Sequence, residues 1–206
     1  MKTVREKQFF ALLIVAIYNC LLLPQLAVVQ KIDQSFYEFL TSARTVGGIS
    51  WMSFISNLGG TAAYLVFLGL VILFCLIKRH WKALVWSLVF FNLMKLGNYW
   101  IKLLVARPRP PNGAFELGTY SMPSGHAANA ILIYGTLWIF LCLKTKNTGL
   151  RFAAFMGGIT LIFAISLSRM YLGVHYLSDV LMGMLWTTLI LALAFNFFVT
   201  KLSKSP

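Results

Sequence analysis

Long apolar runs separated by short polar segments dominate the chain. Six of these runs have roughly the 20 mostly apolar residues that a helix needs to cross the hydrocarbon core of a bilayer. The pattern predicts an all-α, polytopic integral membrane protein with six transmembrane helices. The loops are too short for a separate soluble domain, so we expect residues 1–206 to form one domain. The runs cover residues 8–29, 58–77, 83–104, 127–143, 152–168 and 177–199.

The segment between the first two runs is mixed rather than uniformly polar. In residues 31–57, Phe36, Phe39, Leu40 and Trp51 alternate with polar residues. This pattern predicts a short interfacial, amphipathic helix after the first span, with an ordinary loop as the alternative. A secretory signal peptide is the alternative for the first run itself. Its apolar stretch exceeds the ~7–15 residues of a signal core and no small-x-small site closes it, which favours an uncleaved span.

Composition supports a membrane protein. Hydrophobic residues make up 59% of the chain and charged residues 11%, about half the charged share of a typical soluble domain. Lipid must therefore cover much of the surface, which excludes intrinsic disorder, collagen, a coiled coil and an ordinary cytosolic enzyme. Cys20, Cys75 and Cys142 each lie inside an apolar stretch, which argues against a disulfide framework.

The 18 basic and 5 acidic residues give a formal net charge of +13. They sit in small clusters between apolar runs, which argues against a nucleic-acid partner and favours anionic lipid or an acidic substrate. Eleven basic residues lie on the side shared by the termini and alternate loops, and six lie on the other side. This asymmetry predicts cytoplasmic termini in the plasma (inner) membrane. It leaves an outer cluster of positive charge that topology does not require.

The first unusual polar segment ends the third run. Lys102 lies in its last turns, and Arg107 and Arg109 follow beside Pro108 and Pro110. The prolines cannot continue a helix, so they present the arginines on an extended turn above the span. Interfacial anchoring of a helix end is the alternative interpretation.

The second segment, residues 121–126, directly precedes the fourth run. Ser124 and Gly125 stand where a helix begins, and the unpaired backbone N–H groups and positive dipole at such a start favour a phosphate group. His126 follows in the first turn, within reach of a bound anion. An ordinary Ser124 N-cap beside an uninvolved histidine is the alternative.

The third segment, residues 168–179, joins the last two runs. His175 and Asp179 are four residues apart, so on a helix they share a face and can form a hydrogen bond. A carboxylate that holds one ring nitrogen leaves the other free as a base, a nucleophile or a metal ligand. A structural salt bridge from Asp179 to an arginine is the alternative.

Together the three segments place two histidines, one acid and four basic residues on the outer face, whereas His80 falls in a cytoplasmic loop. Two-metal phosphatases need several carboxylate ligands, and only Asp179, with Glu116 at a stretch, is available here. A single zinc ion bound by two histidines and Asp179 would be repelled by the neighbouring cations. We therefore predict an anion site without a metal ion or other cofactor.

The motifs as a set resemble the type 2 phosphatidic acid phosphatase family, and the six-helix layout is similar to that of its membrane members. The motifs are Lys102-x6-Arg109-Pro110, Pro123-Ser124-Gly125-His126 and Ser168-Arg169-x5-His175-x3-Asp179. The resemblance implies that the phosphoryl oxygens are bound by Lys102, Arg109, Ser124, Gly125 and Arg169. It also implies that His175 attacks phosphorus with support from Asp179, and that His126 protonates the leaving oxygen. Arg107 lies outside the motifs, and we expect it to contact a head group or solvent.

This chemistry is consistent with phosphoryl transfer, which needs charge stabilisation on the transferred oxygens. Attack by His175 would give a phosphohistidine. The sequence thus predicts a lipid phosphatase that hydrolyses a lipid phosphate or pyrophosphate at the outer membrane face without metal. Four substrates suit the same site: phosphatidylglycerol phosphate, undecaprenyl pyrophosphate, phosphatidic acid and a phosphorylated glycolipid.

Two other functions are weaker. A lipid-phosphate carrier would use the same cations, but binding alone does not require the His175–Asp179 pair. Vanadium-dependent haloperoxidases share the motifs, but they are soluble. Lys95 is a separate feature: it lies seven residues before Lys102 on the same helix face, about 10 Å deeper, and we expect it to line the base of the site.

Overall fold

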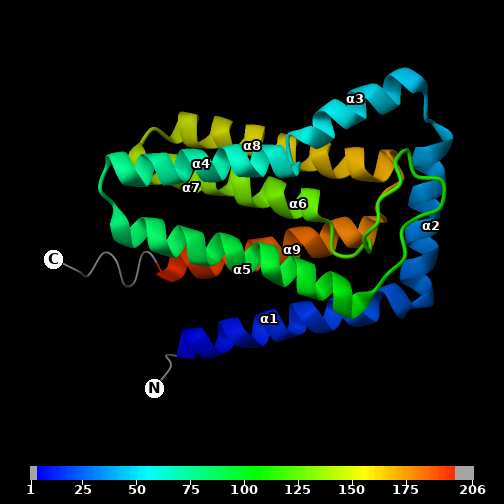
Figure 1. Ribbon diagram of the computed structural model, residues 1–206, viewed down its shortest axis with the longest axis horizontal. Helices are drawn as coiled ribbons and strands as arrows, with labels where there is room; N and C mark the ends of the chain where they lie inside the picture. Colours follow the sequence, from blue (N-terminus) through cyan, green and yellow to red (C-terminus); the bar gives the residue numbers. More distant parts are fainter. Residues whose placement is uncertain (1–3, 198–206) are drawn as a thin grey trace.

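The computed structural model describes residues 4–197, and this part of the chain is helical with no β-strand. Figure 1 shows most of the long helices running along one direction, with α2 crossing one end of the bundle. The all-α prediction is confirmed for the described residues. The α-helices are α1 (Val4–Leu22), α2 (Ala27–Ser42), α3 (Val46–Asn57), α4 (Thr61–Ile77), α5 (Trp81–Val105), α6 (Gly125–Ala130), α7 (Thr136–Lys144), α8 (Thr148–Tyr171) and α9 (Leu177–Phe197). A short 3₁₀ turn, Leu23–Gln25, follows α1, and a π-helical turn, Ile131–Gly135, joins α6 to α7.

Five helical stretches of the described chain are long and apolar enough to cross a membrane. The first contains α3 and α4, and the third contains α6 and α7. A sixth candidate is the pair Ile14–Gln25 and Ala27–Ser42, which bends by 74°. The bend follows Pro24, which cannot donate a helical hydrogen bond and therefore ends α1. The five stretches are Val46–Ile77, Trp81–Val105, Gly125–Lys144, Thr148–Tyr171 and Leu177–Asn196.

The mixed segment predicted to hold one amphipathic helix contains two helices, α2 and α3. On α2, Asp33 and Tyr37 are buried, whereas Phe39 is 72% exposed and Phe36 is 44% exposed. The buried face thus carries a carboxylate and the outward face carries aromatic rings. This distribution suits a helix with apolar surroundings, and it directs an acidic side chain toward the end of the bundle.

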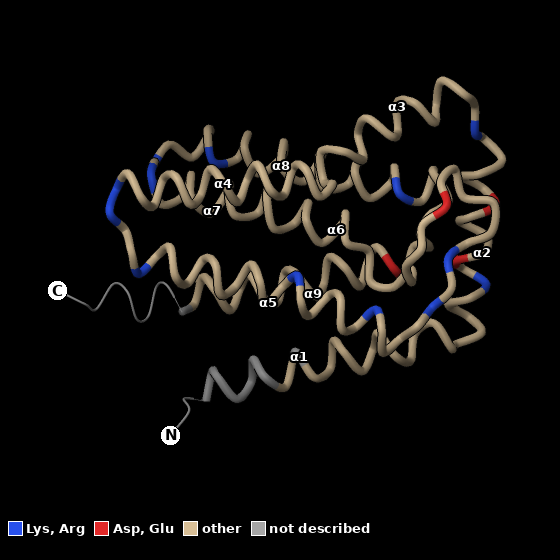
Figure 2. Tube along the Cα trace, viewed as in Figure 1, with Lys and Arg blue, Asp and Glu red and all other residues tan. Residues whose placement is uncertain are grey.

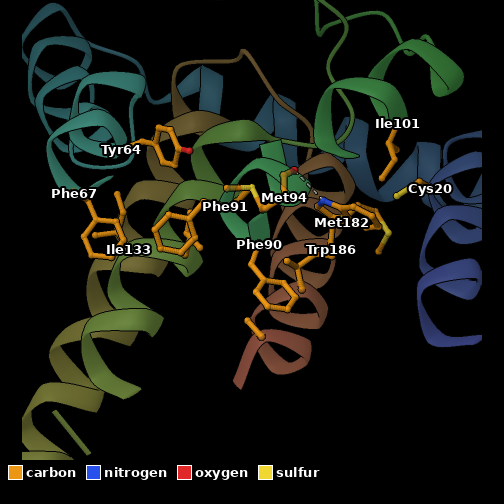
Figure 3. Packing of buried hydrophobic residues seen from close by; sticks show 14 of the residues in the cluster. Cys20, Tyr64, Phe67, Phe90, Phe91, Met94, Ile101, Ile133, Met182 and Trp186 are labelled. Atoms are coloured by element: carbon orange, nitrogen blue, oxygen red, sulfur yellow. Dashed lines mark hydrogen bonds between the residues drawn. The ribbon is translucent and has the colours of Figure 1, made fainter. Parts of the chain in front are cut away.

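The core lies between the long helices and is shown in Figure 3. Trp186 of α9 donates its indole N–H to the backbone oxygen of Met94 on α5 at 3.2 Å. A Cβ atom on Gly97 would lie 2.2 Å from Trp186 Cζ2, so only glycine lets the two helices approach this closely. The close α5–α9 contact holds the last turns of α5 beside the first turns of α9.

Charged residues are distributed unevenly along the bundle. Figure 2 shows the acidic positions that it colours gathered at the end crossed by α2, whereas basic positions occur at both ends. The end crossed by α2 also contains the loop after α5, the start of α6 and the turn between α8 and α9. These are the three segments that the sequence marks as chemically unusual.

Candidate active site

Backbone hydrogen bonds join the three segments at one end of the bundle. The Ser121 N–H donates to the Arg107 oxygen at 2.9 Å, and the Ser124 N–H donates to the Asp179 oxygen at 2.8 Å. In addition, the Ala114 N–H donates to the Leu172 oxygen at 2.8 Å. The loop after α5, the start of α6 and the α8–α9 turn therefore form one continuous site.

His175 lies just before α9, and Asp179 lies in the first turn of that helix. Their side chains are 3% and 0% exposed, and His175 Nδ1 is 3.4 Å from Asp179 Oδ2. This contact is longer than an ordinary hydrogen bond, and Nδ1 has no hydrogen-bond partner among the described residues. The Tyr176 N–H donates to the same carboxylate oxygen at 2.8 Å, which orients it toward the ring.

The opposite ring nitrogen of His175 faces Arg109. Arg109 Nη1 lies 3.3 Å from His175 Nε2 and donates to the Val174 oxygen at 2.7 Å. Burial lowers the pKa of His175 from 6.5 to about 4, because desolvation and the cations of Lys102 and Arg109 together outweigh the charge of Asp179. The imidazole is therefore neutral near pH 7, with one nitrogen toward the carboxylate and the other toward a cation that could hold an anion.

Ser124 occupies the N-cap position of α6, but its side chain makes no capping hydrogen bond. Its hydroxyl is buried and has no hydrogen-bond partner within residues 4–197, which distinguishes it from the ordinary N-cap considered as an alternative. Gly125 and His126 follow at the start of the helical run that continues to Lys144. The charges of Arg169 and Arg109 both act on His126, so its ring lies near the other residues of the site.

Lys102 and Arg169 supply the remaining cations. Lys102 Nζ donates to the backbone oxygens of Tyr120 (2.6 Å) and Ser121 (3.1 Å). The buried Arg169 guanidinium donates from Nη1 to Ser56 Oγ at 2.6 Å, and its Nε has no hydrogen-bond partner in the part of the chain that the structure describes. The structure therefore brings together every residue that the sequence assigned to catalysis or phosphate binding.

Arg107 differs from the expected head-group or solvent contact. Its side chain is only 9% exposed, and it bridges two carboxylates: Nη1 lies 2.7 Å from Asp179 Oδ1, and Nη2 lies 2.7 Å from Asp33 Oδ2. The salt bridge considered as an alternative for Asp179 thus exists alongside its contact with His175. Sequence reasoning did not assign Asp33. Asp33 is one of only five acidic residues in the chain and lies in the mixed segment 31–57, and these were the two sequence features that could have pointed to it.

Lys95 lies deeper in the bundle than Lys102. Its Nζ is 4.2 Å from the centroid of the Tyr64 ring, and its charge acts on His126. The side chain therefore faces the bundle interior rather than lipid. Whether it contributes to the base of the site stays a prediction.

Two cavities flank Arg109. One of about 570 Å³ is bordered by Lys102 and Arg109 together with Tyr99 and Leu103 of α5. The other, of about 390 Å³, is bordered by Arg109 and the loop that contains Glu116. Both are large enough for part of a ligand. The first combines cations with apolar side chains, which is the chemistry of a lipid that carries an anionic group.

The family of the chain follows from its match to the family model described as the PAP2 superfamily, over residues 81–203. The chain belongs to the PAP2 superfamily. This confirms the predicted family and the prediction of an enzyme of the lipid phosphatase class. All the site residues predicted from the sequence lie within the matched range, whereas Asp33 lies outside it.

Individual relatives agree with this PAP2 assignment. The chain is 28% identical over 181 residues to phosphatidylglycerophosphatase B of Bacillus subtilis (strain 168), covering 85% of this chain and 84% of the relative. Its fold is similar to the crystal structure of the first transmembrane PAP2 type phosphatidylglycerolphosphate phosphatase from Bacillus subtilis. That match has a TM-score of 0.78 and 24% identity, and it covers 94% of this chain and 96% of the other. The crystal structure of Aquifex aeolicus LpxE matches with a TM-score of 0.61 and 22% identity, covering 80% of this chain and 94% of that one.

Proposed function

We propose that this PAP2 protein hydrolyses a lipid phosphate or pyrophosphate without a metal ion, through a phosphohistidine on His175. The observation that carries the proposal is the position of the neutral His175 ring between Asp179 and Arg109. A nucleophile needs a free nitrogen beside a bound phosphoryl group, and Arg109 lies next to that nitrogen. The name of the Bacillus relative makes phosphatidylglycerol phosphate the first substrate to test.

Substrate binding would use the cations and the start of α6. Lys102, Arg109 and Arg169 would hold the phosphoryl oxygens together with the Ser124 hydroxyl and the Gly125 N–H. The unpartnered Ser124 Oγ and Arg169 Nε support this assignment, because buried polar groups rarely lack partners. Preorganised donors of this kind stabilise the charge that develops in phosphoryl transfer.

The reaction would proceed in two displacements at phosphorus. In the first, His175 Nε2 donates its lone pair to phosphorus, the bond to the lipid oxygen breaks, and His126 transfers a proton to that leaving oxygen. In the second, His126 removes a proton from water, the water oxygen attacks phosphorus, and the bond to Nε2 breaks. Asp179 keeps the Nδ1 side protonated and balances the positive charge on the ring.

The membrane arrangement is part of the proposal. Residues 1–206 form one domain with six spans, α1 being the first, and α2 lies in the interface across the outer end. The 74° bend after α1 and the aromatic outward face of α2 support this arrangement. The sequence has eleven basic residues in the termini and alternate loops and six in the remaining loops, and by the positive-inside rule this asymmetry supports cytoplasmic termini and an outer site.

Phosphate release in detergent tests the proposal, with phosphatidylglycerol phosphate, undecaprenyl pyrophosphate and phosphatidic acid as substrates. We expect His175→Ala to lower kcat at least 10³-fold, as loss of a covalent nucleophile does. His80→Ala, in the turn before α5, is the matched control and should leave kcat unchanged. When the reaction with ³²P-labelled substrate is quenched rapidly without acid, the protein should retain covalently bound ³²P. The bond to the label should be stable to alkali and labile to acid, as expected of phosphohistidine. Turnover by His175→Ala near the wild-type rate would refute the nucleophile, and binding without phosphate release would favour a carrier.

A further inference from the structure

The buried ion pairs of Arg107 form a chain that reaches from α2 to the candidate nucleophile. Asp33 lies 145 residues before Ser178 in the sequence, yet its Oδ1 accepts the Ser178 N–H at 2.9 Å and its Oδ2 accepts the Ser178 hydroxyl at 2.6 Å. Arg107 then joins Asp33 to Asp179. We propose that Arg107 and Asp33 are positioning residues that set the orientation and the effective charge of Asp179 behind His175. This inference rests on the proposed function.

Orientation follows from how the oxygens of Asp179 are divided. Oδ1 accepts from Arg107 at 2.7 Å, and Oδ2 faces the His175 ring and accepts the Tyr176 N–H. Arg107 thus occupies one oxygen and leaves the other for His175. The Arg107 guanidinium also lies 4.3 Å from the centroid of the Tyr176 ring, which restricts its own movement.

The charges of the group explain why Asp33 is required. Asp33 and Asp179 share one guanidinium, so the three side chains together carry one negative charge. Burial disfavours a charged Arg107, but Asp179 and Asp33 outweigh it and raise the pKa of Arg107. With Asp33 present, Asp179 keeps negative charge for a protonated or phosphorylated His175 ring. Without Asp33, Arg107 would neutralise Asp179 and weaken that support.

Asp33 is held in place by contacts of α2 with the same end of the bundle. The Tyr37 hydroxyl donates to the Pro111 oxygen in the loop after α5. Asp33 itself is 2% exposed, although a cavity of about 310 Å³ lies beside it and Arg107. The site is therefore completed by a helix outside the range matched by the PAP2 family model.

The test compares Asp33→Asn with Glu38→Gln, an identical loss of charge at an exposed position on the same helix. In the full-length protein, Asp33→Asn should lower kcat about 10- to 100-fold, the range seen for residues that orient a metal-binding histidine. KM should change less than about threefold, because Asp33 would not touch substrate. Equal kcat for Asp33→Asn and Glu38→Gln would overturn the inference, as would a raised KM with unchanged kcat.

The pH profile separates charge from simple structural support. His175 is faced by Asp179 of α9, Lys102 of α5, Arg109 of the following loop and His126 of α6. Asp33→Asn should move the acid limb of kcat/KM to lower pH, because the ring then loses negative support. In Asp33→Asn/Arg107→Gln, Asp179 recovers its charge, so the limb should return toward the wild-type position. Identical limbs in all three proteins would overturn the charge argument.

Two further variants keep the outcomes distinct. If Asp33→Asn is not recovered as a folded protein, Asp33→Glu retains the charge and displaces the carboxylate, and its kcat should fall several-fold. An unchanged kcat there would also overturn the inference. An inactive His175→Ala together with a fully active Asp33→Asn refutes only the positioning role, whereas an active His175→Ala refutes the proposed function itself.

Discussion

Gly183 of α9 lies directly against the backbone of Ser124. A Cβ atom at position 183 would be 2.4 Å from the Ser124 oxygen and 3.2 Å from its nitrogen. The Ser124 oxygen accepts the Ala128 N–H at 3.1 Å at the start of α6, and the Ser124 N–H donates to the Asp179 oxygen of α9. The absent side chain of Gly183 therefore sets the separation between two of the three segments of the site.

Gly183→Ala should displace the start of α6 and lower both stability and activity. Forcing a methyl group into a packed contact costs about 1–3 kcal/mol, and a shift of about 1 Å in a binding group can lower kcat about 100-fold. Thermal unfolding in detergent and phosphate release would measure the two effects. Gly157→Ala, where the added Cβ meets nothing within 4 Å, is the control and should unfold no earlier than wild type. Wild-type behaviour of Gly183→Ala would contradict the packing argument.

Arg169 connects the phosphate site to α3 through Ser56, so replacing it by lysine should not be conservative. Lysine has a single ammonium group and cannot donate to Ser56 Oγ and to a phosphoryl oxygen in the fixed geometry of a guanidinium. We expect Arg169→Lys to lower kcat/KM about 100-fold, similar to the loss of one preorganised donor.

Arg151 provides the control for this change, because it lies at the other end of α8 and donates to the oxygens of Thr145 and Cys142. Arg151→Lys should leave kcat/KM within about twofold, the effect expected when the site is untouched. Equal losses in both variants would show that the Arg169 effect is a general weakening of α8.

Acid should destabilise the protein through His175. The folded state keeps the pKa of His175 at about 4, below the ordinary value of 6.5, so the unfolded chain binds the proton first as pH falls. The free energy of unfolding therefore decreases as the pH falls from about 6.5 to about 4. Above pH 6.5, the stabilisation that depends on His175 is fully present. As the pH is lowered through this range, the thermal unfolding midpoint of His175→Gln should decrease less steeply than that of the wild type. A wild-type slope in His175→Gln would contradict the shifted pKa of His175.

Removal of divalent cations should leave activity intact. Lys102, Arg109 and Arg169 act on one another electrostatically in the site, and such a cluster repels a dication. After dialysis against EDTA, kcat for phosphate release should remain within about twofold of its value before chelation. A loss of activity that added Mg²⁺ or Zn²⁺ restores would refute the metal-independent mechanism.

The positions of the helices could largely be predicted from the sequence, because hydrophobic run length reports membrane crossing directly. Most of the site residues could also be predicted, since charged and polar residues at the ends of apolar runs are rare and form recognisable motifs. These residues are Lys102, Arg109, Ser124, His126, Arg169, His175 and Asp179. The individual contacts were harder to predict. The spacing of His175 and Asp179 predicted a hydrogen bond on one helix face, whereas His175 lies before α9 and its Nδ1 is 3.4 Å from the carboxylate.

Only the tertiary structure decided the role of Arg107 and the participation of Asp33. Periodicity indicates which face of α2 is apolar, but it does not indicate that the opposite face, which carries Asp33, packs against the end of the bundle. The bend after Pro24 turns α2 across the end of the bundle, and this brings Asp33 to Arg107 although 74 residues separate them. Local sequence determined the helices and the reactive side chains; the long-range packing of α2 decided which charges surround them, because a carboxylate's effect depends on its distance from other charges in space.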